Sequence, residues 1–467
     1  MNPRIGLALC LAMAATGVAA VARAAGTAPS GDIFPYPIQQ KTLPNGLKMI
    51  VVPFDSPGIV AYYTVVRTGS RDEVEPGKTG FAHFFEHMMF RGTDKYPRDK
   101  YNELLKRMGA DSNASTDDDL TLYHIVGPKR ELETMMDMES DRFKNLKYSE
   151  PAFRTEALAV LGEYNKSVSS PVLPMFEKLQ DLSFTRHTYK HTTLGFLADI
   201  RAMPEQYAWS RLFFERFYRP ENCVLLIVGD VEPAPTFALA ERYYGDWKTG
   251  YKPAEIPVEP PQSEPKSARL SWPNPVHPYL LYGYRAPAFS TTTADWAALD
   301  LIGQVLFSES APLYQELVVD KQWVDRISGG LPARRDPFVF TILARARSEE
   351  LLPQVQKSIA DAIAKLQAEP VDPARLERIK SYLRYSFAAE LDSPSEAAEQ
   401  LAQMIALTGR VETLNELYQR YAQVTPADVQ RVARAVFVPS QQTVITLVHD
   451  APSASPPAGS PGGGNRP

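Results

Sequence analysis

The stretch His83-Phe84-Phe85-Glu86-His87 constrains this chain more than any other part of the sequence. On an α-helix, residues three and four positions apart lie on the same face. His83 and His87 are four apart and Glu86 is three after His83, so two imidazoles and a carboxylate would point the same way. The rest of this helix is strongly apolar, so its polar face would be buried and would need a partner such as a metal ion. We therefore predict a helix that carries a two-histidine metal platform.

The pattern H-x-x-E-H is the inverted form of a zinc-peptidase motif, in which the glutamate acts as a base. The alternative is two histidines that share a helix by chance. With seven histidines in 467 residues, such a match is expected in on the order of one chain in a hundred, which favours the metal. A catalytic zinc ion usually has three protein ligands and one open position, so a third ligand is expected on another element.

Several residues could supply the third ligand: His124, His187, His191 and Glu163. The neighbours of His124 are apolar, which favours a core or edge histidine there. Glu163 lies on a helix predicted over 150–167, two turns after Glu156 on the same face. Gly162 stands beside it, and a glycine inside a helix is costly unless another element approaches closely. We expect that element to be the histidine helix.

The remaining pattern predicts a chain of several domains, because 467 residues exceed what one compact core accommodates. Further helices are predicted over 98–108, 131–146, 204–217 and 293–307, and strands over 47–52, 60–66, 120–126, 223–230 and 279–284. Residues 110–116 are small and polar, which suits an edge strand or a loop. Prolines crowd the segment 249–268, which we interpret as a linker between an N-terminal domain (33–248) and a C-terminal domain (269–450).

An internal echo supports two related halves. Phe217-Tyr218-Arg219-Pro220 leads into the apolar strand at 223–230, and Val436-Phe437-Val438-Pro439 leads into a second apolar strand at 443–450. Each copy runs from a helix through an aromatic residue and a proline into a strand. Each copy also ends its predicted domain, which is where related domains would repeat the same local structure.

The N-terminus has the pattern of a signal peptide over 1–24, with a charged start, an apolar run and a small-x-small site near Ala24. A membrane anchor is the alternative, but the apolar run is short for a span. We expect a periplasmic or secreted protein with no stable membrane anchor. Residues 451–467 read as a disordered tail, and Cys223 as a buried core thiol. The net charge of −5 provides no broad basic field, which argues against nucleic acid as a partner.

These features resemble the M16 family of zinc peptidases, the pitrilysin-like and insulinase-like enzymes, in the branch near the mitochondrial processing peptidases. In that family a ligand glutamate follows the motif at about the spacing seen here, with another glutamate seven residues before it. His87 and Glu163 are 76 positions apart in this chain, and Glu156 precedes Glu163 by seven. The resemblance extends to Asn113-Ala114-Ser115-Thr116, Phe217-Tyr218-Arg219-Pro220 and Leu313-Tyr314-Gln315-Glu316-Leu317, and it covers nearly all of 35–450.

The resemblance implies an α+β fold of two homologous domains, each a mostly antiparallel sheet packed with helices, which together form one half of a clamshell. It implies one zinc ion held by His83, His87 and Glu163, with Glu86 as the base and Glu156 supporting a ligand. The implied reaction is hydrolysis of extended peptides or unfolded polypeptides inside a closed chamber. The substrate would pair with an edge strand near Asn113 and Ala114.

The sequence departs from the family pattern in its second half. Active members there carry an arginine and a tyrosine, spaced R-x6-Y, that bind the substrate carbonyl region. The matching positions here are Val318 and Asp325, which have no donor suited to a developing oxyanion. A shifted alignment would supply Arg326 but no tyrosine. We therefore expect a heterodimer with a homologous chain that carries the Arg/Tyr pair, rather than a homodimer. The alternative function is a non-catalytic, zinc-containing subunit that binds peptides or supports assembly.

Overall fold

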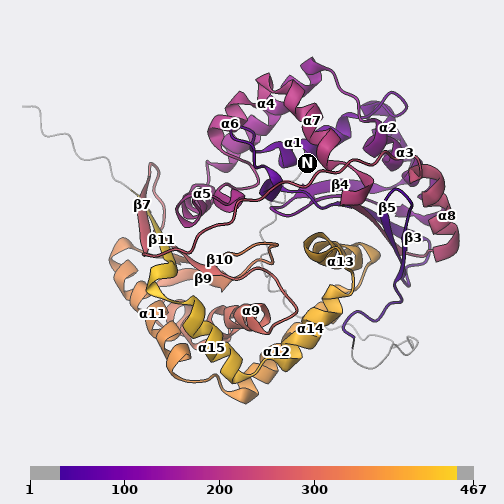
Figure 1. Cartoon of the computed structure of the whole chain (residues 1–467). Coiled ribbons are helices and arrows are strands. Elements are labelled where there is room, and N and C mark those ends of the chain that lie inside the picture. The colour runs from indigo at the N-terminus through magenta and orange to yellow at the C-terminus, as the bar shows by residue number, and fades with distance from the viewer. Residues whose placement is uncertain (1–31, 450–467) are drawn as a thin grey trace, which may run out of the picture.

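The computed structural model describes residues 32–449 and shows a mixed α+β fold built on two separate sheets (Figure 1). The predicted fold class is therefore confirmed. The predicted signal peptide, 1–24, and the predicted tail, 451–467, lie outside the described residues. Within 32–449, none of the helices has the length and apolar character needed to cross a membrane.

The first sheet has six strands in the order β1-β2-β6-β3-β5-β4. They are β1 (Gln39–Thr42), β2 (Lys48–Pro53), β3 (Ile59–Val66), β4 (Asp111–Thr116), β5 (Thr121–Pro128) and β6 (Cys223–Gly229). All neighbours are antiparallel except β2 and β6. The central strands are rich in β-branched and aromatic residues, which fit a pleated surface buried on both faces. Cys223 is buried on β6, as predicted.

The second sheet has five strands in the order β7-β11-β8-β10-β9. They are β7 (Lys266–Trp272), β8 (Tyr279–Ala286), β9 (Val324–Gly330), β10 (Phe338–Ala346) and β11 (Gln442–His449). Its one parallel pair is β7 with β11, so the order repeats that of the first sheet from β2 onward. The strands that follow the two copies of the internal echo, β6 and β11, occupy the same place in this order.

Helices cover one face of each sheet. On the first sheet the covering helices include α1 (Phe81–Met88), α3 (Leu132–Asn145), α4 (Glu150–Ser167), α7 (Tyr207–Phe217) and α8 (Pro233–Tyr244), with α2 (Arg98–Met108) and α6 (Leu197–Ala202) beside them. On the second they are α9 (Asp295–Phe307), α10 (Pro312–Tyr314), α11 (Leu352–Ala368), α12 (Pro373–Glu390), α14 (Thr413–Gln423) and α15 (Pro426–Val436). Several helices start as their sequences predict: Ser149 caps α4 by accepting the Ala152 amide.

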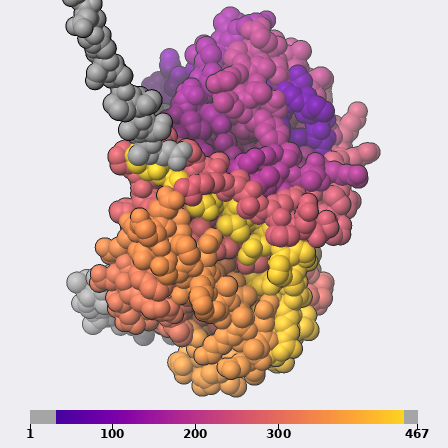
Figure 2. Space-filling model, turned by 90° about the vertical axis from the view of Figure 1, so that its left-hand side faces the viewer, coloured from indigo at the N-terminus to yellow at the C-terminus, as the bar shows by residue number. Residues whose placement is uncertain are grey.

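The two halves of the chain exchange a helix. Helix α5 (Val172–Ser183) follows the first-sheet helices in sequence but packs Met175 and Leu179 against the second sheet. Helix α13 (Pro394–Thr408) comes from the second half but covers the other face of the first sheet, beneath β3 and β6 (Figure 1). Each sheet is therefore buried on both faces only when both halves are present. Figure 2 shows the two halves in contact along their length, indigo to magenta above and orange to yellow below.

The segment between the sheets is extended, and strand β7 begins at Lys266, so the last three residues of the predicted linker, 266–268, belong to β7. These residues join the second sheet because β7 pairs in parallel with β11. The prolines that suggested a linker lie before this strand in the sequence. The predicted domain boundaries at 33–248 and 269–450 remain predictions.

Candidate metal centre

Helix α1 carries the motif and begins at a fixed point. Gly80 precedes it with φ of 89°, a left-handed conformation that favours glycine. The buried carboxylate of Glu73 accepts hydrogen bonds from the amides of Gly80 and Ala82, each at 2.7 Å. A carboxylate at a helix N-terminus satisfies free N–H groups and complements the helix dipole. The start of the motif helix is therefore fixed from outside the helix.

Three donor groups converge beside α1. The carboxylate of Glu163, on α4, lies 3.3 Å from Nε2 of His87 and 3.7 Å from Nε2 of His83. One ligand atom from each of the three residues lies within 4.8 Å of the others. Ligands that hold one zinc ion at about 2.0–2.2 Å have separations of this order. Of the third-ligand candidates, Glu163 is thus the one that the fold brings to the two histidines.

The two histidines differ in charge preference. Burial, together with the neighbouring imidazole, lowers the pKa of His83 to about 4, so His83 offers a free lone pair at neutral pH. Burial also disfavours charge on His87, but hydrogen bonds to Glu156 and Glu163 outweigh it and raise its pKa to about 10. A cation that binds between these groups would displace the proton of His87, because a ligating imidazole must present a lone pair.

Glu156 lies behind His87 rather than among the donors. Its carboxylate accepts a hydrogen bond from Nδ1 of His87, at 3.1 Å. It also forms an ion pair with Arg91, a residue just beyond α1. The hydrogen bond leaves Nε2 of His87 facing Glu163, which is the arrangement expected of a histidine held for metal binding. The sequence analysis missed Arg91, although its position four residues after His87 puts it on the same side of the helix.

Glu86 faces the edge strand β4. Its carboxylate accepts a hydrogen bond from the hydroxyl of Thr116, at 2.7 Å. Burial raises the pKa of Glu86 to about 7, although the Thr116 hydrogen bond and the nearby His87 lower it. A carboxyl group whose pKa lies near neutrality both takes and returns protons readily. Thr116 belongs to the segment that carries the family resemblance, but no local sequence pattern singles it out from its neighbours.

Strand β4 ends the first sheet, so one of its sides pairs with β5 and the other has no neighbouring strand within the described residues. Asn113 is exposed on this strand and Ala114 is buried. The prediction that 110–116 is an edge strand or a loop is confirmed as an edge strand. An edge strand offers free backbone N–H and C=O groups that an extended peptide can pair with.

The other histidines are occupied elsewhere. His124 stacks on Tyr63, with ring centroids 5.0 Å apart. Nδ1 of His187 accepts the Tyr189 amide, so its Nε2 donates to Asp336, at 3.1 Å. His191 is buried, and its Nδ1 donates to the Thr192 carbonyl, at 3.0 Å.

One expectation about the helix that carries Glu163 is wrong. A side chain built at Gly162 would meet nothing within 4 Å, so no element packs closely against this glycine. Helices α4 and α1 are in contact, but not at Gly162. The side chain of Glu163 spans the remaining distance to the two histidines.

The two second-half positions lie on different elements. Val318 is half-buried against the second-sheet core, and Asp325 lies on β9. The Asp325 carboxylate accepts hydrogen bonds from Nε of Arg345, at 2.7 and 3.0 Å. Both side chains are therefore engaged within the second half.

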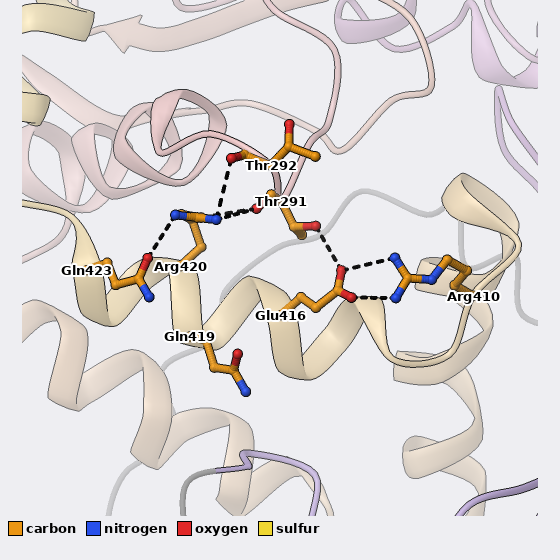
Figure 3. A pocket seen from close by; sticks show the side chains of 7 residues that line it. All are labelled: Thr291, Thr292, Arg410, Glu416, Gln419, Arg420 and Gln423. Atoms are coloured by element: carbon orange, nitrogen blue, oxygen red, sulfur yellow. Dashed lines mark hydrogen bonds and ion pairs between the residues drawn. The ribbon is translucent and has the colours of Figure 1, made fainter.

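A polar cavity of about 280 Å³ is lined by α14 together with Arg410 and the segment Thr291-Thr292, and none of the three donor residues beside α1 lines it (Figure 3). Arg410 pairs there with Glu416, and Arg420 donates to the Thr291 carbonyl. The charged groups Arg410, Glu416 and Arg420 are thus paired with neighbouring atoms in Figure 3, and Gln419 donates to Asp32, which lies outside that view.

Comparison with known proteins adds the family context. The family model described as "Insulinase (Peptidase family M16)" matches residues 56–195, and the one described as "Peptidase M16 inactive domain" matches 210–383. The zinc protease PqqE of Helicobacter pylori is 27% identical over 417 residues, which cover 87% of this chain and 91% of that protein.

Two solved structures are similar. A protease from Helicobacter pylori has a TM-score of 0.83 and 27% identity, over 88% of this chain and 99% of that chain. The periplasmic protease PqqL from Escherichia coli has a TM-score of 0.71 and 20% identity, over 91% of this chain but 48% of that chain. The likeness to PqqL concerns the fold alone. This chain matches about half of the length of the PqqL chain.

Proposed function

This chain belongs to the M16 family of peptidases, and on that premise we propose that it is a zinc-dependent endopeptidase. Its substrates would be extended peptides or unfolded polypeptides. The observation that carries the proposal is the convergence of donor atoms from His83, His87 and Glu163 within 4.8 Å, on the helix that also presents Glu86.

The donor set fits one zinc ion per chain. Two imidazoles and a carboxylate are a common set for catalytic zinc, and they leave a position open for water or substrate. When bound, zinc supplies a Lewis acid that polarises a carbonyl and makes water more acidic. His83, His87 and Glu163 would hold the ion, and Glu156 with Arg91 would hold His87 in the ligating orientation.

The base in this proposal is Glu86. It would take a proton from the attacking water and return it to the nitrogen of the leaving amine. A pKa near neutrality suits both steps, because the group must be ionised before the attack and protonated after it. The hydroxyl of Thr116 holds the carboxylate in one orientation for this transfer.

The substrate would extend the first sheet by pairing with β4 near Asn113 and Ala114. Backbone hydrogen bonds of this kind tolerate many side chains, which suits an enzyme that accepts varied sequences. The unpaired side of the strand is available, and Thr116 at its end contacts Glu86. A peptide on this edge would therefore pass beside the base.

We further propose that the active form is a heterodimer with a homologous chain that carries the Arg/Tyr pair, closed around a chamber. Val318 and Asp325 supply no donor to a developing oxyanion, and the carboxylate of Asp325 is already paired with Arg345. The fold-level match to about half of a longer chain supports a pairing of two such halves. Export to the periplasm or beyond is proposed from the N-terminal pattern, and the E. coli protein of this fold is described as periplasmic.

A second candidate is a non-catalytic zinc-containing subunit that binds peptides or supports assembly. The match of residues 210–383 to the model described as an inactive domain favours it. The retained base argues against it, since a subunit that only binds peptides has no need for Glu86 beside the donors, nor for a hydroxyl that orients Glu86.

Substitution of Glu86 by Gln separates these functions. The variant should retain close to one zinc ion per chain, because Glu86 is not one of the proposed ligands. It should lose peptide cleavage, because a glutamine amide cannot take a proton from the attacking water. Glu163→Gln should lose both zinc and cleavage, whereas Glu103→Gln, on the exposed face of α2, should change neither. Zinc content by elemental analysis and turnover of a fluorogenic peptide, with the partner chain present, are the measurements. Cleavage that survives in Glu86→Gln would refute the mechanism.

The assembly is tested apart from the chemistry. Purified chain is assayed alone and after mixing with an exported homologous chain that has R-x6-Y and lacks H-x-x-E-H. We expect turnover only in the mixture, together with a complex of twice the mass in light scattering. Full turnover by this chain alone would refute the heterodimer and leave the peptidase proposal standing.

A further inference from the structure

The loop between β9 and β10 interlocks with the turn between β4 and β5. The loop presents Arg334-Arg335-Asp336, and the turn presents Asp117-Asp118-Asp119. The loop belongs to the second sheet and the turn to the first, so the contact joins the two halves of the chain. We call these two segments the arginine loop and the aspartate turn.

Arg334 makes the central contact. Its two terminal nitrogens donate to the two carboxylate oxygens of Asp117, at 2.7 and 3.0 Å. Its Nε lies 2.7 Å from the carboxylate of Asp118. The Arg334 side chain is 15% exposed and that of Asp118 is 5% exposed. One guanidinium therefore bridges two successive aspartates in a largely buried setting, where its rigid fork fixes geometry as well as charge.

The next residues continue the contact in register. The amide of Arg335 donates to the Asp119 carboxylate, at 3.0 Å. Asp336 accepts hydrogen bonds from Nε of Arg71, at 2.5 Å, and from His187, at 3.1 Å. The arginine loop is thus held at three successive residues, each by a group of the first half of the chain.

The three aspartates depend on the arginine loop to different degrees. Asp118 also accepts the hydroxyl of Ser70, at 2.9 Å, and Asp119 accepts that of Tyr189, at 2.9 Å. For Asp117 the other contact among the described residues is the amide of Asp118. Asp117 therefore relies on Arg334 for its only side-chain partner in that part of the chain, and it is the residue directly after Thr116.

Thr116 is the last residue of β4, and its hydroxyl donates to Glu86. Thr116 pairs with Thr121 of β5 at the end of the ladder, and the Asp117 amide donates to the Leu120 carbonyl, at 2.9 Å, to close the turn that follows. The side chain of Asp117, at the start of this turn, is the part that Arg334 holds. We infer that Arg334 is a positioning residue for the proposed peptidase reaction: through Asp117 it fixes Thr116, and through Thr116 it fixes the carboxylate of Glu86. This inference rests on the proposed function for its catalytic consequence, but the mechanical link between the halves does not.

A purely stabilising role is the alternative for this ion pair. Buried ion pairs add little net stability, because desolvation offsets much of their attraction, whereas loss of one partner leaves an uncompensated charge. The two roles differ in what a substitution changes. A stabilising pair alters the fraction of folded protein, while a positioning pair alters the folded protein at β4 and Glu86.

Hydrogen exchange tests the mechanical link without any assay of activity. In Arg334→Gln, amides of β4 and of the aspartate turn should exchange about tenfold faster or more, while amides of β11 keep their wild-type rates. Asp117→Asn removes the same ion pair from the other side and should give the same pattern if Arg334→Gln folds poorly. Arg431→Gln, which breaks an exposed ion pair between Arg431 on α15 and Asp295 on α9, is the matched control and should leave β4 unchanged. Wild-type exchange at β4 in both test variants would overturn the inference.

Kinetics test the route through Thr116. Arg334→Gln should lower kcat about tenfold, the loss expected when one hydrogen bond of about 1.4 kcal/mol no longer orients the base, with zinc content unchanged. Arg334→Lys, which keeps the charge but not the fork, should recover part of this loss. In a Thr116→Val background, Arg334→Gln should have no further effect on kcat, because the link is already broken there.

Two results would count against this route. Independent, multiplicative losses of kcat in the double variant would show that Arg334 does not act through Thr116. An equal loss in Arg431→Gln would show a general effect of charge removal. If wild-type protein with its partner cleaves no peptide, the proposed function fails, and the exchange experiment still decides whether the arginine loop holds β4.

Discussion

His87 donates a hydrogen bond from Nδ1 to the carboxylate of Glu156, 3.1 Å away, and this contact directs its other ring nitrogen toward Glu163. The carboxylate is itself held by Arg91. A histidine fixed in this way does not have to lose ring rotation when it binds a metal, so the contact favours binding.

Glu156→Gln should weaken zinc binding about tenfold or more, because the neutral amide no longer assists the His87 hydrogen bond or pairs with Arg91. Competition with a chelator of known affinity measures the change. Glu150→Gln, at the exposed start of the same helix, should bind zinc as the wild type does. Equal zinc affinity in Glu156→Gln and wild type would show that Glu156 does not support the site.

Thr116→Val should lower kcat about tenfold at constant zinc content, since a methyl group replaces the hydroxyl that orients Glu86. Steady-state kinetics with a peptide substrate, in the presence of the partner chain, measure the loss. Ser115→Ala, at an exposed position of the same strand, should leave kcat unchanged. A loss confined to KM would instead place Thr116 in peptide binding.

Gly69→Ala and Gly162→Ala should change stability in opposite directions. A Cβ at Gly69 would lie 2.2 Å from the carbonyl oxygen of Asp117, a backbone atom that cannot move cheaply, so we expect a loss of about 3 kcal/mol or more in unfolding free energy. A Cβ at Gly162 would meet nothing within 4 Å, so the gain in helix propensity should stabilise by about 0.5–1 kcal/mol. Chemical denaturation gives both values, and destabilisation by Gly162→Ala would mean that a close contact exists there.

Asp336 should make stability depend on acid. Burial would raise the pKa of Asp336, but hydrogen bonds from His187 and Arg71 outweigh it and lower the pKa from 3.8 to about 2. A depressed pKa contributes stability that is present above about pH 4 and is lost as the pH falls through 2. Partial exposure reduces this contribution to on the order of 1 kcal/mol.

The matching variant is Asp336→Asn. It should be less stable than wild type at pH 6, and the difference in unfolding free energy should shrink as the pH falls from 4 to 2, where the wild-type carboxylate is protonated too. Urea denaturation across this range measures the difference. A difference that stays constant with pH would mean that the Asp336 charge is not what stabilises the contact.

Much of the local structure follows from sequence signals that act over a few residues. The predicted helices at 98–108 and 150–167 have the observed bounds of α2 and α4. Gly109 ends α2 in the left-handed conformation, and Ser149 caps α4, so the residues at the ends carry the information themselves. The helical predictions at 204 and 293 begin two to three residues early, because turns precede α7 and α9.

The sequence by itself determined which chemical groups this protein has to offer: two histidines and a glutamate on one helical face, and two further glutamates two turns apart. Helical periodicity fixes such neighbours because they are three, four or seven residues apart. Only the tertiary structure decided which distant groups join them. Three contacts join separate elements in this way: the hydrogen bond from Thr116 to Glu86, the ion pair of Arg91 with Glu156, and the ion pair of Arg334 with Asp117. Such contacts depend on how the sheets and helices pack, and no local pattern in the chain encodes that packing.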